Sequence, residues 1–300
     1  AWLKMISSLN IKIKSHLVML LFSLFVTGSF IFGKIFAEII QPDVLTFYRF
    51  LLGAIILGGY LSLTKKLSGA VLIRPWRYFV LGGIYSIYFV FMFIALRHTS
   101  TISTSAIFAL MPFSTLILDT LIFNKKSKLL IWLALGLSSF GALFIIFEGS
   151  LENALNFKVD YGELIFLIGT IVYSSYALLQ PRLNNSENLL ITTFGVLTAG
   201  SVILGSTLII QDKNLIPDTI SMGLIFLIIY LAIFASIGTI LCLNFASNKI
   251  PGTNVMAYSL LIPFWVLLVE SFSKEGLAPA YTYVGIIPIG LGLLILYRNS

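Results

Sequence analysis

Long apolar stretches separated by short polar breaks run through the whole chain. Cutting at the charged and the Pro-, Asn- or Gly-rich breaks leaves ten apolar segments, each close to the ~20 residues that a helix needs to cross the hydrocarbon core of a bilayer. The segments are 16–36, 44–64, 76–96, 102–123, 129–147, 161–180, 189–210, 222–246, 253–272 and 280–297. The pattern predicts an all-α integral membrane protein with ten transmembrane helices, joined by connections too short to hold a soluble domain.

Composition supports a membrane protein and narrows its chemistry. Of 300 residues, 58% are hydrophobic and only 10% are charged, which is more apolar surface than a soluble core can bury. A single cysteine, Cys242, allows no intrachain disulfide, and the two histidines, His16 and His98, lie in different segments. We therefore expect no metal and no cofactor.

Charge predicts how the chain is oriented. The net charge of +7 comes from basic residues in short loops, so the positive-inside rule explains it better than nucleic-acid binding does. With a cytoplasmic N-terminus, most loop Lys and Arg residues also fall on the cytoplasmic side, among them Lys65, Lys66, Lys125, Lys126 and Arg182. The expected protein is a multi-pass protein of the inner (plasma) membrane, with both termini cytoplasmic.

The fourth and ninth segments resemble one another. Residues 95–126 and 246–277 align at a constant offset that pairs Pro112 with Pro263 and Asp119 with Glu270. A proline within an apolar helix, followed seven residues later by an acid, thus occurs twice. The repetition indicates a duplicated membrane domain.

Two further matches follow in the same order along the chain. TFYRFLLGAIILG at 46–58 pairs with TFGVLTAGSVILG at 193–205, and Gly136 and Gly141 pair with Gly285 and Gly290. We place one repeat at 1–150 and the second at 151–300. Five helices in each repeat make the second copy inverted relative to the first, as in alternating-access transporters.

These motifs resemble a known family. GSFIFGK at 28–34, QPDVLTFYRFLLGA at 41–54 and the positions of Lys34, Arg49, Pro112 and Pro263 are similar to the EamA-like branch of the drug/metabolite transporter superfamily. The resemblance implies two inverted five-helix halves around a central cavity and transport of small metabolites, often export of amino acids or related compounds. The family's glutamate after the proline is matched by Glu275 in the second half but replaced by Asn124 in the first.

Charged residues inside the segments are candidates for coupling or gating. At 1.5 Å of rise per residue, Lys34, Arg49 and Glu270 lie at a shared depth about 10 Å to the outer side of the midplane. Glu270 is expected to pair with Lys34 or Arg49, either as an outer gate or as a static ion pair between helices. Asp119, about 10 Å to the inner side, is the best candidate for a proton carrier, unless Lys125, Lys126 or Lys128 neutralises it.

Polar and aromatic residues on single helix faces are candidates for substrate binding. Hydroxyl-tipped aromatic faces suit a small zwitterionic, cationic or aromatic solute, although such rows also serve helix packing. The candidates are Tyr85, Tyr88, Met92, Ser105, Tyr173, Tyr176, Asn254 and Tyr258. Pro112 and Pro263 are expected to act as hinges, or else as tolerated kinks.

The expected function is secondary transport of a small metabolite, in the direction of export, by alternating access. Alternatives are a proton-coupled exporter of lipophilic cations or drugs, a passive facilitator and, in another class, a membrane-embedded enzyme. The sequence has no phosphate-binding P-loop and no nucleophile elbow, so we expect no enzymatic activity. The predicted partners are the small solute, the lipid bilayer and, as a candidate coupling ion, protons.

Overall fold

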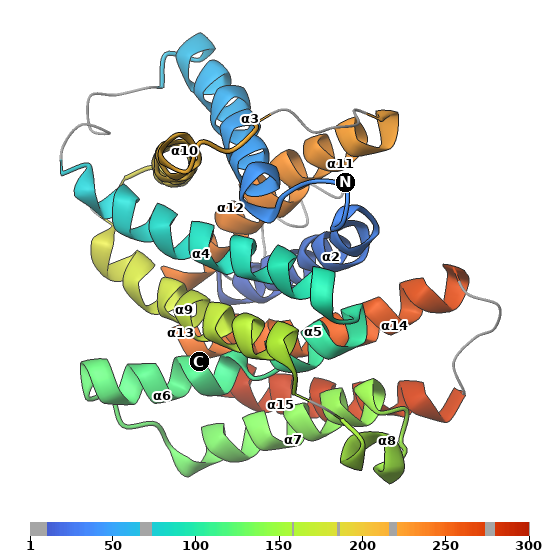
Figure 1. Ribbon diagram of the computed structural model, residues 1–300. Helices are drawn as coiled ribbons and strands as arrows, with labels where there is room; N and C mark the ends of the chain where they lie inside the picture. Colours follow the sequence, from blue (N-terminus) through green and yellow to red (C-terminus); the bar gives the residue numbers. More distant parts are fainter. Residues whose placement is uncertain are drawn as a thin grey trace, which may run out of the picture.

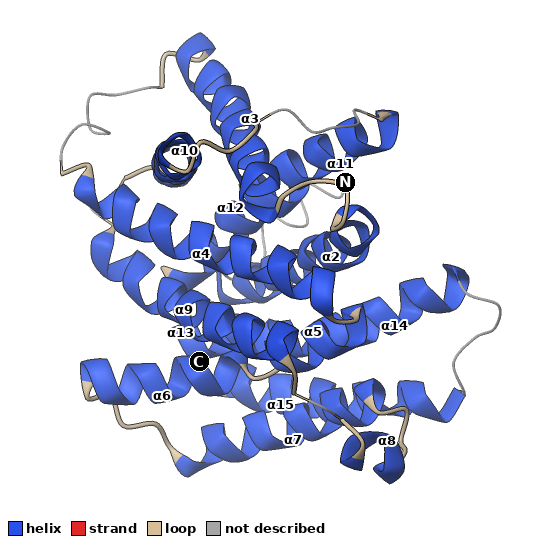
Figure 2. Cartoon of the chain, viewed as in Figure 1, coloured by secondary structure: helices blue, strands red, loops and turns tan. Residues whose placement is uncertain are grey.

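A computed structural model describes residues 11–66, 74–157, 159–184, 187–215, 221–273 and 280–299; Glu275 lies outside them. Within these ranges every regular element is a helix and no strand occurs (Figure 2). Ten helices are long and apolar enough to cross a membrane. The first of them begins at Ile11, earlier than the apolar pattern predicted. The predicted fold class is confirmed.

The spans are built from the following helices. The first five are α2 (Ile11–Phe36), α3 (Pro42–Leu63), α4 (Trp76–His98), α5 (Thr101–Phe108) with α6 (Met111–Phe123), and α7 (Leu129–Ile146). The next three are α9 (Tyr161–Leu183), α10 (Leu189–Ile210), and α11 (Met222–Ala232) with η2 (Ile233–Gly238) and α12 (Thr239–Ser247). The last two are α13 (Gly252–Met256) with η3 (Ala257–Leu261) and α14 (Ile262–Ser273), and η4 (Ala280–Gly285) with α15 (Ile286–Arg298).

Helix packing follows a pseudo-two-fold pattern. The second and seventh spans, α3 and α10, pack together, and so do the fifth and tenth, α7 and α15 (Figure 1). The third span packs on the sixth (α4 on α9). The corresponding contact in the other half is that of the eighth span with the first (α12 on α2). Likewise α6 packs on α9 as α14 packs on α2. The two five-helix halves are therefore interleaved rather than side by side.

The fourth and ninth spans are broken at corresponding places. The fourth divides after Phe108, and the ninth passes through the 3-10 turn η3. Pro112 and Pro263 each occupy the second position of the helix that follows, where a proline removes no helical hydrogen bond. The breaks meet each other, because the Ser259 hydroxyl donates to the Phe108 carbonyl at 3.5 Å. In a bilayer, side chains of this kind satisfy the backbone groups that a broken helix frees.

A close backbone approach joins α7 to the last span. A Cβ atom added at Gly141 would lie 2.4 Å from the Gly285 carbonyl oxygen, and one added at Gly285 would lie 2.6 Å from the Gly141 oxygen. Gly136 and Gly290 have no such neighbour within 4 Å. The close contact therefore joins one glycine from each of the two aligned pairs, and the other two glycines do not limit the distance between these helices.

The short helix α8 (Leu151–Leu155) was not predicted. It follows α7 at the predicted outer face, where the Ser150 side chain caps it by accepting from the Asn153 amide at 3.2 Å. Leu151 and Leu155 are largely exposed. An apolar surface helix at this level suits the bilayer interface.

Candidate functional site

Four of the predicted tyrosines form one cluster at the interface between the halves. Tyr85 and Tyr88 come from α4, Tyr173 and Tyr176 come from α9, and all four are fully buried. Tyr88 and Tyr173 stack with ring centroids 4.1 Å apart and planes inclined by 13°. Tyr85 contacts Tyr173 and Tyr176 with centroids 5.5 Å and 5.3 Å apart. The row of each helix therefore faces the row of the other, and the structure closes the cluster to solvent.

Two hydroxyl groups of this tyrosine cluster bind the eighth span. The Tyr85 hydroxyl lies 2.7 Å from Thr239 Oγ1, and the Tyr176 hydroxyl donates to Asn244 Oδ1 at 3.1 Å. Tyr88 Oη, by contrast, is buried without a hydrogen-bond partner among the described residues. A buried polar group left open in this way marks a place where a solute or a water belongs.

Arg49 of α3 lies against the same cluster. Its guanidinium carbon is 3.7 Å from the centroid of the Phe89 ring, and Phe89 contacts Tyr85 and Tyr88 with centroid distances of 4.9 Å and 4.6 Å. The side chain is completely buried. The sequence signal for this residue was its charge within an apolar helix, and the structure adds its aromatic surroundings.

The partners of Arg49 come from a π-helical turn. In η2 the eighth span widens to π geometry, which is frequent at functional sites. Arg49 Nε donates to Ser236 Oγ at 2.8 Å, and Nη2 donates to the Ala235 carbonyl at 2.5 Å. The turn belongs to the second half and Arg49 to the first, so this contact also crosses the repeat interface. The sequence did not predict the π turn itself, because such a turn has no signature in an apolar helix.

Tyr258 and Asn254 make their hydrogen bonds away from the tyrosine cluster. Tyr258 Oη bonds to His16 Nδ1 at 2.7 Å near the first turns of α2, and Asn254 Nδ2 donates to the Leu296 carbonyl at 3.0 Å in α15. These contacts hold helices together. Met92, from the same row of α4 as two of the tyrosines, is fully buried in the hydrophobic core that also contains all four tyrosines of the cluster.

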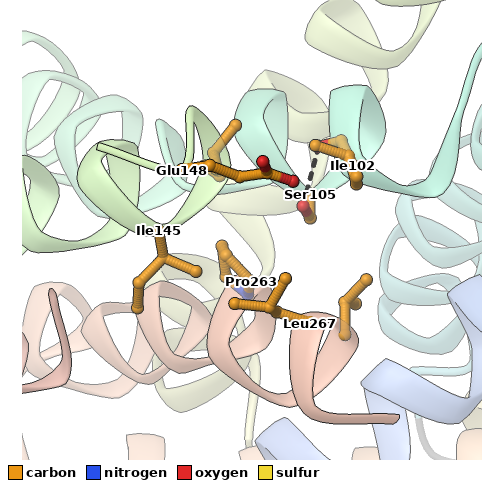
Figure 3. Close-up of a pocket in the computed structure, with 8 residues that line it drawn as sticks. Ile102, Ser105, Ile145, Glu148, Pro263 and Leu267 are labelled. Atoms are coloured by element: carbon orange, nitrogen blue, oxygen red, sulfur yellow. Dashed lines mark hydrogen bonds between the residues drawn. The ribbon is translucent and has the colours of Figure 1, made fainter. Parts of the chain in front are cut away.

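Ser105 lines a separate small pocket at the predicted outer side (Figure 3). The pocket has a volume of about 10 Å³, enough for about one water molecule. Pro263 and Leu267 of the ninth span form one wall, and the Glu148 carboxylate points toward Ser105. The Ser105 hydroxyl is already engaged with the Ile102 carbonyl at 2.7 Å. Both halves contribute to this pocket, but it holds no organic solute in this conformation.

The expected pairing of Glu270 with Lys34 or Arg49 is wrong for this conformation. Lys34 Nζ donates to the carbonyls of Leu96 and Thr99 at 2.8 Å and 3.0 Å, and Arg49 binds η2. In the part of the chain that the structure describes, neither cation forms an ion pair with an acid. Shared depth alone was a poor guide, because backbone carbonyls freed at a helix end and at the π turn compete for both cations.

Asp119 has basic partners on two sides. Its carboxylate lies 3.7 Å from Lys125 Nζ and 3.6 Å from Arg182 Nη2, and only 6% of its side chain is exposed. The sequence named Lys125 as an alternative to proton carriage, but it did not identify Arg182. Arg182 also lies 3.4 Å over the Phe123 ring. The contact joins α6 of the first half to α9 of the second, at the predicted cytoplasmic face.

Known proteins are similar to this chain in sequence and in fold. The family profile of EamA-like transporters matches residues 13–147 and 160–298. The chain is 25% identical over 282 residues to "Uncharacterized transporter YyaM" of Bacillus subtilis strain 168, covering 93% of this chain and 92% of that one. It is 26% identical over 288 residues to an "Uncharacterized transporter" of Archaeoglobus fulgidus, covering 91% and 93%.

A solved crystal structure of a protein has the same fold. It matches 95% of this chain and 98% of its own at a TM-score of 0.72, with 14% sequence identity. The ten spans and the match of the family profile to both halves agree with the resemblance noted from the sequence motifs. The chain is a multi-pass membrane protein that belongs to the EamA-like transporter family.

Proposed function

We propose that this protein is a secondary transporter that moves a small polar or amphipathic metabolite, such as an amino acid or a related compound, by alternating access. The repeats at 1–150 and 151–300 are the two moving halves, and the substrate binds between them. The proposed location is the inner membrane with both termini cytoplasmic, and the proposed direction is export.

One observation carries this proposal: the tyrosine cluster draws two rings from each half and is closed to solvent. A site at the repeat interface, near the middle of the membrane, is what inverted-repeat transporters require. Stacked rings with a free hydroxyl suit a solute that has both an apolar and a polar part. The closed cluster corresponds to an occluded conformation, which opens when the halves rock apart.

Export of lipophilic cations or drugs is the second candidate. Asp119 and Glu270, the acids that would attract a cation, lie outside the tyrosine cluster, whereas a guanidinium lies beside it. A positive charge at the site repels a cation, so the metabolite is favoured. A passive facilitator shares the same site and differs only in energy coupling.

The test is transport by the purified protein in liposomes. A panel of labelled amino acids and small amines is offered with and without an imposed pH gradient, and protein-free liposomes give the background. Saturable uptake of one solute class supports the proposal, and acceleration by the gradient shows proton coupling. Saturable uptake that ignores the gradient indicates a facilitator or an exchanger. Uptake of lipophilic amines alone would favour the second candidate.

Variants connect the activity to the site. Tyr173→Ala removes the ring that stacks on Tyr88 and should abolish saturable uptake. Tyr60→Ala, at a largely exposed tyrosine of α3, is the matched control and should transport normally. Equal activity of both variants would place the substrate site elsewhere.

A further inference from the structure

Arg49 is a buried cation without a counter-charge. It is fully enclosed, and no carboxylate of the described residues lies within ion-pair distance of it. Its surroundings are aromatic instead, because the guanidinium carbon lies 3.7 Å from the ring centroid of Phe89 and 5.9 Å from those of Phe50 and Phe93. A charge held in this way inside a membrane protein is costly, and such residues mark solute or ion pathways.

The guanidinium also keeps an unused donor. Nε and Nη2 bind Ser236 and the Ala235 carbonyl, and Phe89 covers a face of the planar group. Nη1 is buried without a hydrogen-bond partner among the described residues. All three nitrogens of an arginine side chain can donate hydrogen bonds. The protein therefore uses the Nε and Nη2 side of the guanidinium and leaves Nη1 available.

A second open donor lies in the same neighbourhood. The Tyr88 hydroxyl is buried and has no hydrogen-bond partner among the described residues, and the Tyr88 ring contacts Phe89, the ring that the Arg49 guanidinium faces. Lys34, another cation within the spans, donates to the carbonyls at the end of α4. Arg49, by contrast, is a membrane-embedded cation whose hydrogen bonding is incomplete among the described residues, and it lies beside the aromatic cluster.

We propose that Arg49, together with the Tyr88 hydroxyl, binds a carboxylate group of the transported solute. The planar fork of arginine matches a carboxylate geometrically, and the bound anion supplies the missing counter-charge. The apolar part of the solute lies against the rings of Tyr85, Tyr88 and Tyr173. This inference rests on the proposed transport function and adds the chemical group that is recognised.

A purely structural role for Arg49 makes a different prediction about stability. If its bonds to η2 serve only to join α3 to the eighth span, Arg49→Met will unfold at a lower temperature than the wild type. If the arginine awaits an anion, the solute-free variant will be at least as stable, because a buried charge without a partner has been removed. Thermal unfolding of the solute-free protein in detergent separates the two roles.

Binding is measured on the full-length protein by the rise in unfolding temperature that a ligand produces. The probes are phenylalanine and leucine, each compared with its amide and with the amine that lacks the carboxyl group, and 3-phenylpropionate, compared with its amide; inorganic phosphate is added as a different anion. We expect stabilisation by at least one acid and at least 10-fold weaker binding of its amide and amine. Arg49→Met and Arg49→Lys should each weaken binding of the acid by roughly 10- to 100-fold, the loss of a charge-assisted bidentate contact.

Tyr88→Phe provides a second test of the site in case the Arg49 variants fail to fold. It removes only a hydroxyl that has no hydrogen-bond partner among the described residues, so folding should be unchanged while affinity for the acid falls by roughly 3- to 10-fold. Lys34→Gln, which removes a different cation within the spans, should keep the preference for the acid over its amide.

Several outcomes overturn the carboxylate site. They are binding of none of the acids, equal binding of acid and amide, stabilisation by phosphate alone, and an unchanged acid preference in Arg49→Met. The transport proposal fails separately, if acids bind in an Arg49-dependent way but no solute crosses the liposome membrane.

Discussion

Lys34 and Arg97 each bind the carboxyl end of the helix that carries the other. Lys34, near the end of α2, donates to the Leu96 and Thr99 carbonyls at the end of α4. Arg97, in the last turn of α4, donates to the Ala37 carbonyl at 2.5 Å and to the Ile40 carbonyl at 2.8 Å, just beyond α2. Because the last carbonyls of a helix have no partner within it, the exchange satisfies both ends with cations that also suit the helix dipoles.

This reciprocal contact predicts coupled effects on stability. Lys34→Met and Arg97→Met should each lower the free energy of unfolding by about 1–3 kcal/mol, the usual contribution of hydrogen bonds from a charged donor. Since both side chains tie the same two helix ends, the second substitution should cost less in the background of the first. Thermal unfolding of the two single variants and the double variant measures this coupling.

Lys126→Met, at an exposed position of the opposite face, is the control and should be neutral. Strictly additive losses for the double variant would show that the two cations act independently. If instead Lys34→Met is stable but changes which solutes are transported, Lys34 belongs to the substrate path and not to a helix clamp.

Asp119 makes an ion pair between the halves at the predicted cytoplasmic face. Its contact with Arg182 must break when α6 and α9 separate there. Asp119→Asn should therefore favour the inward-open state by roughly 5-fold, the equivalent of about 1 kcal/mol. The measurement is the rate at which a membrane-impermeant maleimide labels Ala177→Cys, a buried position of α9, in a Cys242→Ser background and in inside-out vesicles.

Asp43→Asn serves as the matched control, because Asp43 pairs with Lys213 at the opposite face. That substitution should leave labelling from the cytoplasmic side unchanged or reduce it. If Asp119→Asn instead leaves labelling unaffected and abolishes all stimulation of transport by a pH gradient, that result would support the proton-carrier role of Asp119.

The different surroundings of Gly136 and Gly141 allow a sharp comparison within α7. Gly141→Ala places a methyl group 2.4 Å from a backbone oxygen that cannot move without shifting a helix, so it should cost about 1–3 kcal/mol of stability. Gly136→Ala meets nothing within 4 Å and should be neutral or slightly stabilising, since alanine favours helix. Unfolding temperatures in the same detergent decide the point, and equal values for the two variants would contradict the close approach.

Sequence reasoning predicted the spans well and the side-chain partners poorly, for a physical reason. Length and hydropathy determine which segments cross a bilayer, so the ten spans follow from the chain alone. Spacing along a helix also placed Tyr85 with Tyr88 and Tyr173 with Tyr176 on common faces. Which face meets which depends on packing between distant helices, and for that reason Tyr258 and Asn254 were grouped with the tyrosine cluster although they bind His16 and α15.

The fate of the charged residues shows the same limit. Depth along a helix can be counted, but hydrogen-bond partners freed by helix breaks cannot. Lys34 binds the end of α4 and Arg49 binds a π turn, whereas Glu270 was expected to pair with one of these two cations. The prolines gave the better signal, because a proline near the middle of a span indicates that the helical hydrogen bonds are interrupted there.

Pro112 and Pro263 allow a test that separates a hinge from a tolerated kink. Each lies in the first turn of the helix after a break, so replacing it with alanine restores a donor but breaks no existing bond. Pro112→Ala and Pro263→Ala should therefore change the free energy of unfolding by less than about 1 kcal/mol. If the breaks bend during transport, alanine lets the helix extend backward through the break and slows turnover, while affinity for the solute stays the same.

Initial rates of uptake and half-saturation concentrations in liposomes measure turnover and affinity. Because the two breaks meet at Phe108 and Ser259, the double variant should be slower than either single variant. Unchanged turnover in all three variants would leave the prolines as packing features of two broken helices.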